Sequence, residues 1–212
     1  MADKIKISEM TPATSIVATD TVAGVVSGAS KSITAEQFVM VQSLTDTRWV
    51  DLRFPLARDK QGATQKPDYD YTNMGLLFPK NDTAEIAYFI GQMPHYWKIG
   101  TDLYPHVHFT QYEDIANVYK IDYRWYVLGG DPTGGFTTLE LSSFVYTYTS
   151  GSISQIASSA TAIDGSGITG VSSIIEVKLY RDDNLGSGDL LTKEFDIHYE
   201  IDSLGSDTEF VK

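Results

Sequence analysis

The chain has 212 residues, with 28 acidic against 16 basic side chains, so its formal net charge is −12, and it contains no cysteine. A surface this negative repels a phosphate backbone and anionic lipids, so we expect neither nucleic acid nor a membrane as a direct partner. The absence of cysteine excludes disulfides, thiolate zinc sites and a cysteine nucleophile. Because no apolar stretch approaches ~18 residues and the start carries no apolar signal-peptide core, we expect no spanning helix and no secretory signal.

The composition is typical of a β-sheet protein. Aromatic residues make up 12% of the chain and include 13 tyrosines, while Thr, Ser, Val, Ile and Gly are also plentiful. These residue types favour strands joined by short turns. The length is that of one ordinary domain, or of one domain with a small module.

Residues 1–45 differ from the rest because they contain no Trp or Tyr. Alternation at residues 5–7 predicts a short strand, and valines between glycines at residues 22–26 predict a second small strand or hairpin. A threonine followed three residues later by a glutamine matches a capping box and predicts a short helix over residues 34–41. So few large side chains make a marginal core, so we expect residues 1–45 to form a small N-terminal module that leans on the main domain, on a partner or on its own copies.

Residues 46–212 form the second predicted domain, a succession of short strands. We expect loops at residues 58–73, 129–135, 150–170 and 181–188, with room for a weak strand in residues 150–170. Pro105 lies inside one predicted strand and indicates a sheet edge or a bulge there. The strands are expected at residues 49–54, 74–78, 84–90, 103–110, 118–128, 136–149, 174–180 and 195–201.

Alternation gives these strands one apolar and one polar face. Half-buried alternating strands indicate antiparallel sheets, and about eight of them favour an all-β, antiparallel two-sheet sandwich of jelly-roll type. A closed barrel or an immunoglobulin-like sandwich is the alternative. The last strand places Phe195, Ile197, Tyr199 and Ile201 inside and Glu194, Asp196, His198 and Glu200 outside.

Three histidines are the candidate metal ligands. His106 and His108 are two residues apart in a strand, so both imidazoles share a face, and His198 lies on the polar side of its own strand beside Glu200. Three histidines and a carboxylate would suit a zinc- or iron-binding jelly roll such as a cupin. The local glycine-containing cupin signatures are absent, however, and these side chains face outward. We therefore expect no metal site and no cofactor, and a plain exposed or inter-subunit sheet.

Other chemical motifs are weaker. Residues 182–189 resemble a calcium loop, but position twelve is Lys193 where an EF-hand requires glutamate, and a turn rich in Asp, Asn and Gly needs no ion. Gly-x-Ser-x-Gly, P-loop and dinucleotide fingerprints are absent. Sequence spacing cannot select a glycosidase carboxylate pair among 28 acidic residues. We expect no enzyme activity and assign no catalytic residue.

The aromatic residues exceed what one core must absorb. Tyrosine and tryptophan favour interfaces because they combine apolar area with a polar tip, sugar stacking is a second use, and plain core packing is the alternative for any single residue. This surplus, with the marginal N-terminal module, predicts a homotrimer. The residues concerned are Tyr69, Tyr71, Tyr96, Trp97, Tyr104, Tyr112, Tyr126, Tyr146 and Tyr148.

Two regions resemble bacteriophage proteins. Lys-Ile-Ser-Glu-Met-Thr-Pro-Ala-Thr at residues 6–14, followed by residues 19–22, residues 28–34 and Gln37-Phe38, resembles a short module at the N-termini of many tailed-phage spikes, fibres and head appendages. Residues 94–109, with Pro-His-Val-His-Phe at their end, and residues 197–206, Ile-His-Tyr-Glu-Ile-Asp-Ser-Leu-Gly-Ser, resemble phage structural proteins encoded among head and neck genes.

The resemblance implies a jelly-roll virion protein, a trimeric head decoration (cement) protein or head fibre. Its partners would be the major capsid protein or other virion proteins. Its place would be the capsid exterior or neck after assembly in the host cytoplasm, which the lack of cysteine fits. The histidines belong to the resembling segments, but the family gives them no catalytic role. Many decoration proteins lack the N-terminal module, so a neck, collar or tail-fibre adaptor is the alternative, and a carbohydrate-binding jelly roll is a third.

Overall fold

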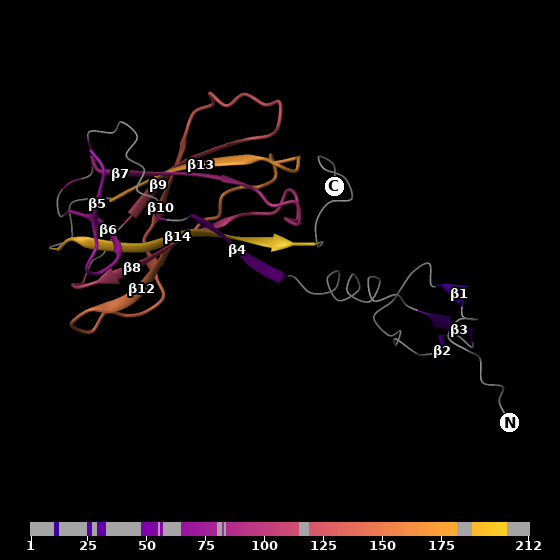
Figure 1. Cartoon of the computed structure of the whole chain (residues 1–212), viewed down its shortest axis with the longest axis horizontal. Coiled ribbons are helices and arrows are strands. Elements are labelled where there is room, and N and C mark those ends of the chain that lie inside the picture. Colours follow the sequence, from indigo (N-terminus) through magenta and orange to yellow (C-terminus); the bar gives the residue numbers. More distant parts are fainter. Residues whose placement is uncertain are drawn as a thin grey trace.

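All regular structure in the described part of the chain is β-strand. The computed structural model describes residues 11–12, 25–26, 29–32, 48–54, 56, 65–79, 82, 84–114, 119–181 and 188–202. From residue 48 onward the strands form two antiparallel sheets that enclose one apolar core (Figure 1). The predicted all-β, two-sheet architecture is confirmed.

The first sheet has four strands in the order β10-β9-β13-β7. Its central strand β13 shows the clearest alternation, because Ile175, Val177 and Leu179 are all buried. Large apolar side chains at every second position make this face suitable only for a core. The strands are β7 (Ile86–Gln92), β9 (Tyr119–Tyr126), β10 (Thr137–Leu141) and β13 (Ile174–Arg181).

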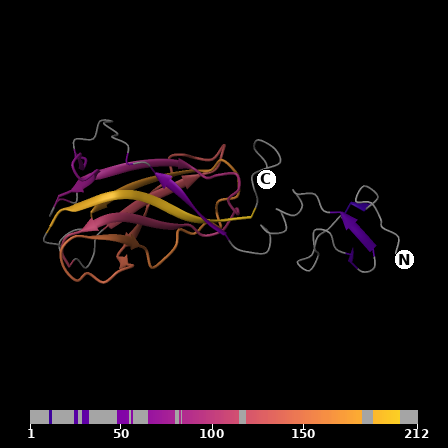
Figure 2. The ribbon, with the colours of Figure 1, turned by 60° about the horizontal axis from the view of Figure 1, so that its bottom comes forward.

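The second sheet has seven strands, and the long strand β14 (Leu190–Ile201) runs through its middle (Figure 2). One edge of β14 pairs with β8 (Tyr104–Gln111). Its other edge pairs first with β6 (Gly75–Phe78) and then with β4 (Arg48–Phe54), so two short strands share one long neighbour. The remaining strands are β5 (Asp68–Asp70), β11 (Ser143–Phe144) and β12 (Ile153–Ser158).

Aromatic rings connect the two sheets in the core. Phe195 of β14 lies 5.2 Å from Phe54 of β4 and 5.3 Å from Phe89 of β7, measured between ring centroids. Phe89 belongs to the four-stranded sheet and the other two rings to the seven-stranded sheet. Burying one such side chain is worth about 1.5–3 kcal/mol, and closely placed rings add to that.

A third, small sheet lies in the N-terminal part of the chain and has the order β1-β3-β2. It consists of β1 (Thr11–Pro12), β2 (Val25–Val26) and β3 (Ala29–Ser32), with β2 and β3 antiparallel and β1 parallel to β3 (Figure 1). The predicted valine hairpin is confirmed by β2 and β3. The strand at residues 5–7 and the helix at residues 34–41 lie outside the described residues.

Two strands lie in segments predicted as loops, the second of which was allowed a weak strand. Strand β5 falls within residues 58–73, and β12 is a full six-residue strand within residues 150–170. The inward face of β12 carries Gln155 and Ala157, not large apolar side chains, so hydrophobic alternation could not reveal it. Gln155 is tolerated in the interior because its Nε2 donates to Gln111 Oε1 at 3.1 Å and to the Tyr146 carbonyl at 2.6 Å.

The interpretation of Pro105 as an edge or bulge marker is wrong, because β8 lies between β12 and β14. Leu103 exchanges two backbone hydrogen bonds with Ile163. Because every second residue of a strand directs its backbone nitrogen to the same neighbour, the Pro105 nitrogen faces the side of β8 on which Ile163 lies. On that side β12 ends at Ser158, which pairs with His106. Pro105 thus occupies the start of a central strand, where the neighbouring strand has already ended.

Candidate functional site

A group of histidines and aspartates lies on the outer face of the seven-stranded sheet. Strand β8 contributes His106 and His108, β14 contributes Asp196 and His198, and β4 contributes Asp51. Pairing places His106 opposite Asp196, and His198 opposite Asp51. Because alternate residues share a face, three adjacent strands bring these side chains together. We call them the histidine cluster.

Asp196 lies at the centre of the histidine cluster and is only 2% exposed. Its Oδ2 atom lies 2.9 Å from His108 Nε2, at ion-pair distance. Its Oδ1 atom lies 3.5 Å from His106 Nδ1 and 3.7 Å from His198 Nε2. The rings of His106 and His198 have centroids 4.0 Å apart, so both imidazoles border the same carboxylate oxygen.

Two buried atoms of the cluster, Asp196 Oδ1 and His106 Nδ1, have no hydrogen-bond partner among the described residues. Hydrogen bonds between nitrogen and oxygen are 2.7–3.2 Å long, so the contacts around Oδ1 are too long to count. A buried polar atom without a partner is costly, and the cost is greater for a carboxylate. The cluster therefore carries an energetic cost that a bound ligand could relieve.

The environment favours the neutral form of His198. Burial lowers the pKa of His198, and the neighbouring His106 lowers it further, whereas the carboxylates of Asp196 and Asp51 oppose the shift. Its Nε2 lies 2.9 Å from Asp51 Oδ1. A neutral imidazole donates from one ring nitrogen and offers a lone pair at the other, which is the form that binds divalent metals.

The outward direction of the three histidines is confirmed, since Val107 and Phe109 between and beside them are fully buried. Glu200 does not join them, because it forms an ion pair with Lys98 at 2.9 Å. Sequence reasoning missed that Asp196 supplies the carboxylate. The outward parity of Asp196 was read correctly, but parity alone does not reveal burial under neighbouring side chains.

One group of potential ligand atoms stands out in the part of the chain that the structure describes. The ligand atoms of His106, Asp196 and His198 lie within 4.8 Å of one another. Imidazole nitrogen and carboxylate oxygen are ligands for zinc and related divalent ions. The segment that resembles a calcium loop cannot be placed beside this group, because residues 182–187 lie outside the described residues.

The aromatic residues singled out from the sequence differ in how far they are buried. Trp97 is fully buried in the core, and its indole nitrogen donates to Thr101 Oγ1 at 3.2 Å, so for this residue the core-packing alternative holds. Tyr104 is exposed and contacts Trp49 edge-to-face at 5.3 Å on the same sheet face as the histidine cluster. Tyr71, Tyr112 and Tyr146 are also exposed.

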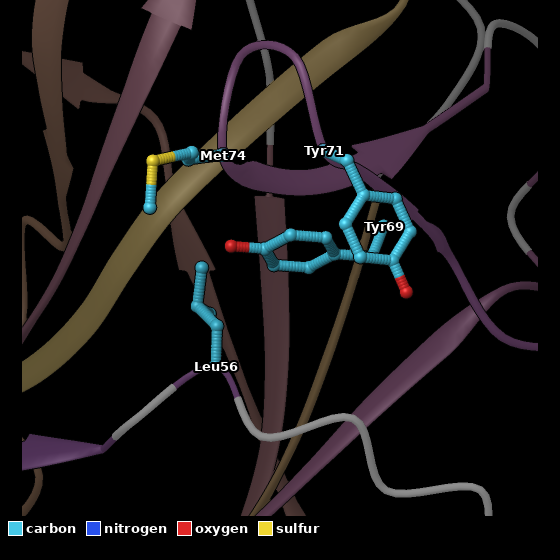
Figure 3. Close-up of a pocket in the computed structure, with 4 residues that line it drawn as sticks. All are labelled: Leu56, Tyr69, Tyr71 and Met74. Carbon is cyan, nitrogen blue, oxygen red and sulfur yellow. The ribbon is translucent and has the colours of Figure 1, made fainter.

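A separate hollow of about 320 Å³ is lined by Leu56, Tyr69, Tyr71 and Met74. Figure 3 shows the Tyr69 ring extending between Leu56 and Met74, beside Tyr71. The Asp70 carboxylate organises the turn by accepting hydrogen bonds from the Thr72 and Asn73 amides at 2.8 and 3.0 Å. The hollow presents mostly apolar surface, which is suited to a contact with another apolar group and not to bond chemistry.

The described residues include no long apolar helix of the kind that crosses a lipid bilayer. No protein-family model, curated protein or solved structure matches this chain, so its function is inferred from the geometry and chemistry of its own residues.

Proposed function

We propose that this chain is a structural protein of a tailed-bacteriophage virion that decorates and stabilises the capsid through non-covalent contacts with capsid proteins. The strand order is the observation that carries the proposal. Eight strands divide as β6-β14-β8-β12 and β7-β13-β9-β10. This order supports a jelly roll, in which the first and last strands are neighbours and successive strands alternate between sheets except at one hairpin.

Jelly rolls also occur in lectins and cupins, so the fold alone does not identify the function. Among these classes, the resemblance of residues 94–109 and 197–206 to phage head and neck proteins favours the virion. The histidine cluster lies on an outer sheet face, whereas a cupin holds its metal inside the barrel. The fold and the resemblance together support a structural role.

Strand β7 provides a surface suited to protein contacts. It is an edge strand, and its outer face exposes Ile90 by 71% and Tyr88 by 49%. Exposed apolar side chains beside an open strand edge favour association with another chain. Each contact of standard size buries roughly 1,600 Å², and many copies on a shell would together raise the barrier to its rupture.

Imaging of intact particles tests the location. Particles of the phage that encodes this chain would be examined with a specific antibody, and the copy number measured on a gel. Many copies spread over the head support decoration. A few copies at one vertex or on the tail would replace this proposal with the neck, collar or tail-fibre adaptor, which the resemblance of the N-terminal residues favours.

A binding assay tests the surface. Purified protein would be added to particles that lack it, with Ile90→Lys as the variant. Leu128→Lys is the matched control, because Leu128 is 68% exposed but lies outside strand β7. We expect Ile90→Lys to weaken binding at least tenfold and Leu128→Lys to bind as wild type. Equal binding by all three proteins would remove β7 from the contact.

Attachment through the N-terminal residues is a separate part of the proposal. A chain that begins at Asp46 should remain β-rich in circular dichroism but lose most binding to the particles, because one of two linked contacts is removed. The predicted homotrimer is checked on the full chain by light scattering, in which a stable 23.4 kDa monomer would contradict it.

A further inference from the structure

The Oδ1 atom of Asp196 faces two nitrogen atoms at a spacing that hydrogen bonds do not explain. It lies 3.5 Å from His106 Nδ1 and 3.7 Å from His198 Nε2. Asp196 is 2% exposed, and within the described part of the chain neither Oδ1 nor His106 Nδ1 has a hydrogen-bond partner. A buried carboxylate oxygen therefore points at two imidazoles without bonding to either.

The same spacing is close to that between two ligands of one metal ion. Zinc binds nitrogen and oxygen at 2.0–2.2 Å in tetrahedral geometry, which places two ligand atoms roughly 3.4 Å apart. The observed distances exceed this by only a few tenths of an ångström, and small rotations of the imidazole rings would remove the difference. An ion there would also supply the positive charge that a buried carboxylate otherwise lacks.

The surroundings of Asp196 already hold its carboxylate in position. His108 Nε2 lies 2.9 Å from Oδ2, at ion-pair distance, which leaves Oδ1 to face His106 and His198. Polar neighbours of this kind commonly orient metal ligands from outside the coordination shell. Asp51 Oδ1, 2.9 Å from His198 Nε2, holds this imidazole in the absence of an ion and would add negative charge beside it.

We propose that His106 Nδ1, Asp196 Oδ1 and His198 Nε2 bind one divalent transition-metal ion of the zinc class on the outer face of the seven-stranded sheet. The side chains of His106 and His198 are partly exposed, so a further position is open to water or to a donor from another molecule. The ion joins β8 to β14. This site replaces the expectation, drawn from outward parity, that the histidines hold no metal, and it does not depend on the proposed virion function.

Metal content and thermal stability test the site directly. The full chain, without a histidine tag, would be treated with chelator, dialysed against Zn²⁺ and analysed for bound metal. We expect one zinc per chain. Because the ion binds only the folded state, a hundredfold excess over its dissociation constant should raise Tm by about 5–10 °C. Co²⁺ should show the visible absorption of a four-coordinate ion with nitrogen and oxygen ligands.

Three single variants show whether the histidine cluster is responsible for zinc binding. Asp196→Asn and His198→Gln should each weaken Zn²⁺ affinity at least tenfold and abolish the zinc-dependent rise in Tm. His95→Gln is the matched control, since His95 is the one other histidine in the chain and its Nε2 lies 2.9 Å from Ser172 Oγ. Circular dichroism and the metal-free Tm establish that each variant is folded.

His198→Gln keeps the test decisive if Asp196→Asn fails to fold, because His198 is partly exposed and its replacement leaves the core untouched. Binding of one zinc that is lost in His198→Gln and kept in His95→Gln supports the site. Wild-type protein without bound zinc, or equal loss of binding in His95→Gln and His198→Gln, would overturn it.

Discussion

The outer faces of the two sheets obey the same alternation but differ in how their charges are satisfied. On the four-stranded sheet, Arg124 pairs with Glu176 at 2.6 Å, and Lys120 with Glu140 at 3.4 Å. These partners lie directly opposite one another on neighbouring strands. On the seven-stranded sheet, Asp196 of β14 lies opposite His106 of β8, and its Oδ1 has no hydrogen-bond partner among the residues that the structure describes.

This difference in charge pairing distinguishes an ordinary protein surface from a candidate ligand-binding site. Opposite charges on adjacent strands stabilise a sheet modestly, and every group on the four-stranded face discussed above has its partner within the chain. The histidine cluster instead keeps a buried charge without full compensation, which natural proteins retain mainly where a ligand or a function uses it. We therefore expect the two faces to respond differently to substitution, to metal and to pH.

The largest change in the free energy of unfolding is expected for a substitution in the core between the two sheets. Phe195→Ala removes a buried ring between the sheets and should lower the free energy of unfolding by about 3–5 kcal/mol, since it loses burial and leaves a cavity. Ile90→Ala, at an exposed position of β7, should change it by less than about 0.5 kcal/mol. Urea denaturation of both variants measures this, and similar losses would contradict the placement of Phe195.

The free energy of unfolding should respond differently when one carboxylate is neutralised on each face. Glu176→Gln weakens the bonds to Arg124 and Tyr126 and should cost about 1 kcal/mol. Asp196→Asn, measured with chelator present, should cost nothing or stabilise by up to about 1 kcal/mol, because it removes an uncompensated buried charge.

Chemical denaturation in chelator-containing buffer measures both changes. The same experiment repeated with Zn²⁺ should reverse the sign for Asp196→Asn, because only the wild type then gains the bound ion. If Asp196→Asn destabilises the metal-free protein more than Glu176→Gln does, the carboxylate is better satisfied than its contacts indicate.

The smallest expected effect on stability is the one that high pH has through Tyr180, on the outer face of the four-stranded sheet. Burial, followed by the hydrogen bond that the Tyr180 hydroxyl donates to Asp122, raises the pKa of Tyr180 to about 12 from its ordinary value of 10. A raised pKa means that folding favours the neutral phenol. The stabilisation is therefore complete below pH 10 and is lost as the pH rises through 12.

Absorbance of ionised tyrosine, compared between wild type and Tyr180→Phe, isolates this titration from those of the other tyrosines. We expect the difference spectrum to develop only near pH 12. A difference that is complete by pH 10 would show that the contact with Asp122 has little effect on the phenol.

The sequence by itself determined the all-β class and the direction of most side chains. Alternation with a period of two is a local property, so it places Val107 inside and His106 and His108 outside without knowledge of any neighbour. It likewise separated Phe195 and Ile197 from the polar residues of β14. Where a strand carries no apolar alternation, as in β12 with its inward Gln155, the same rule has nothing to detect.

The tertiary structure decided which strands became neighbours, and hence the site. Asp196 has the same parity as Glu194 and Glu200, but only Asp196 lies between His106 of β8 and His198, beneath side chains that cover it. The pairing of β8, β14 and β4 joins segments far apart in the chain. Burial, unsatisfied atoms and ligand spacing depend on that pairing, which no local pattern of residues encodes.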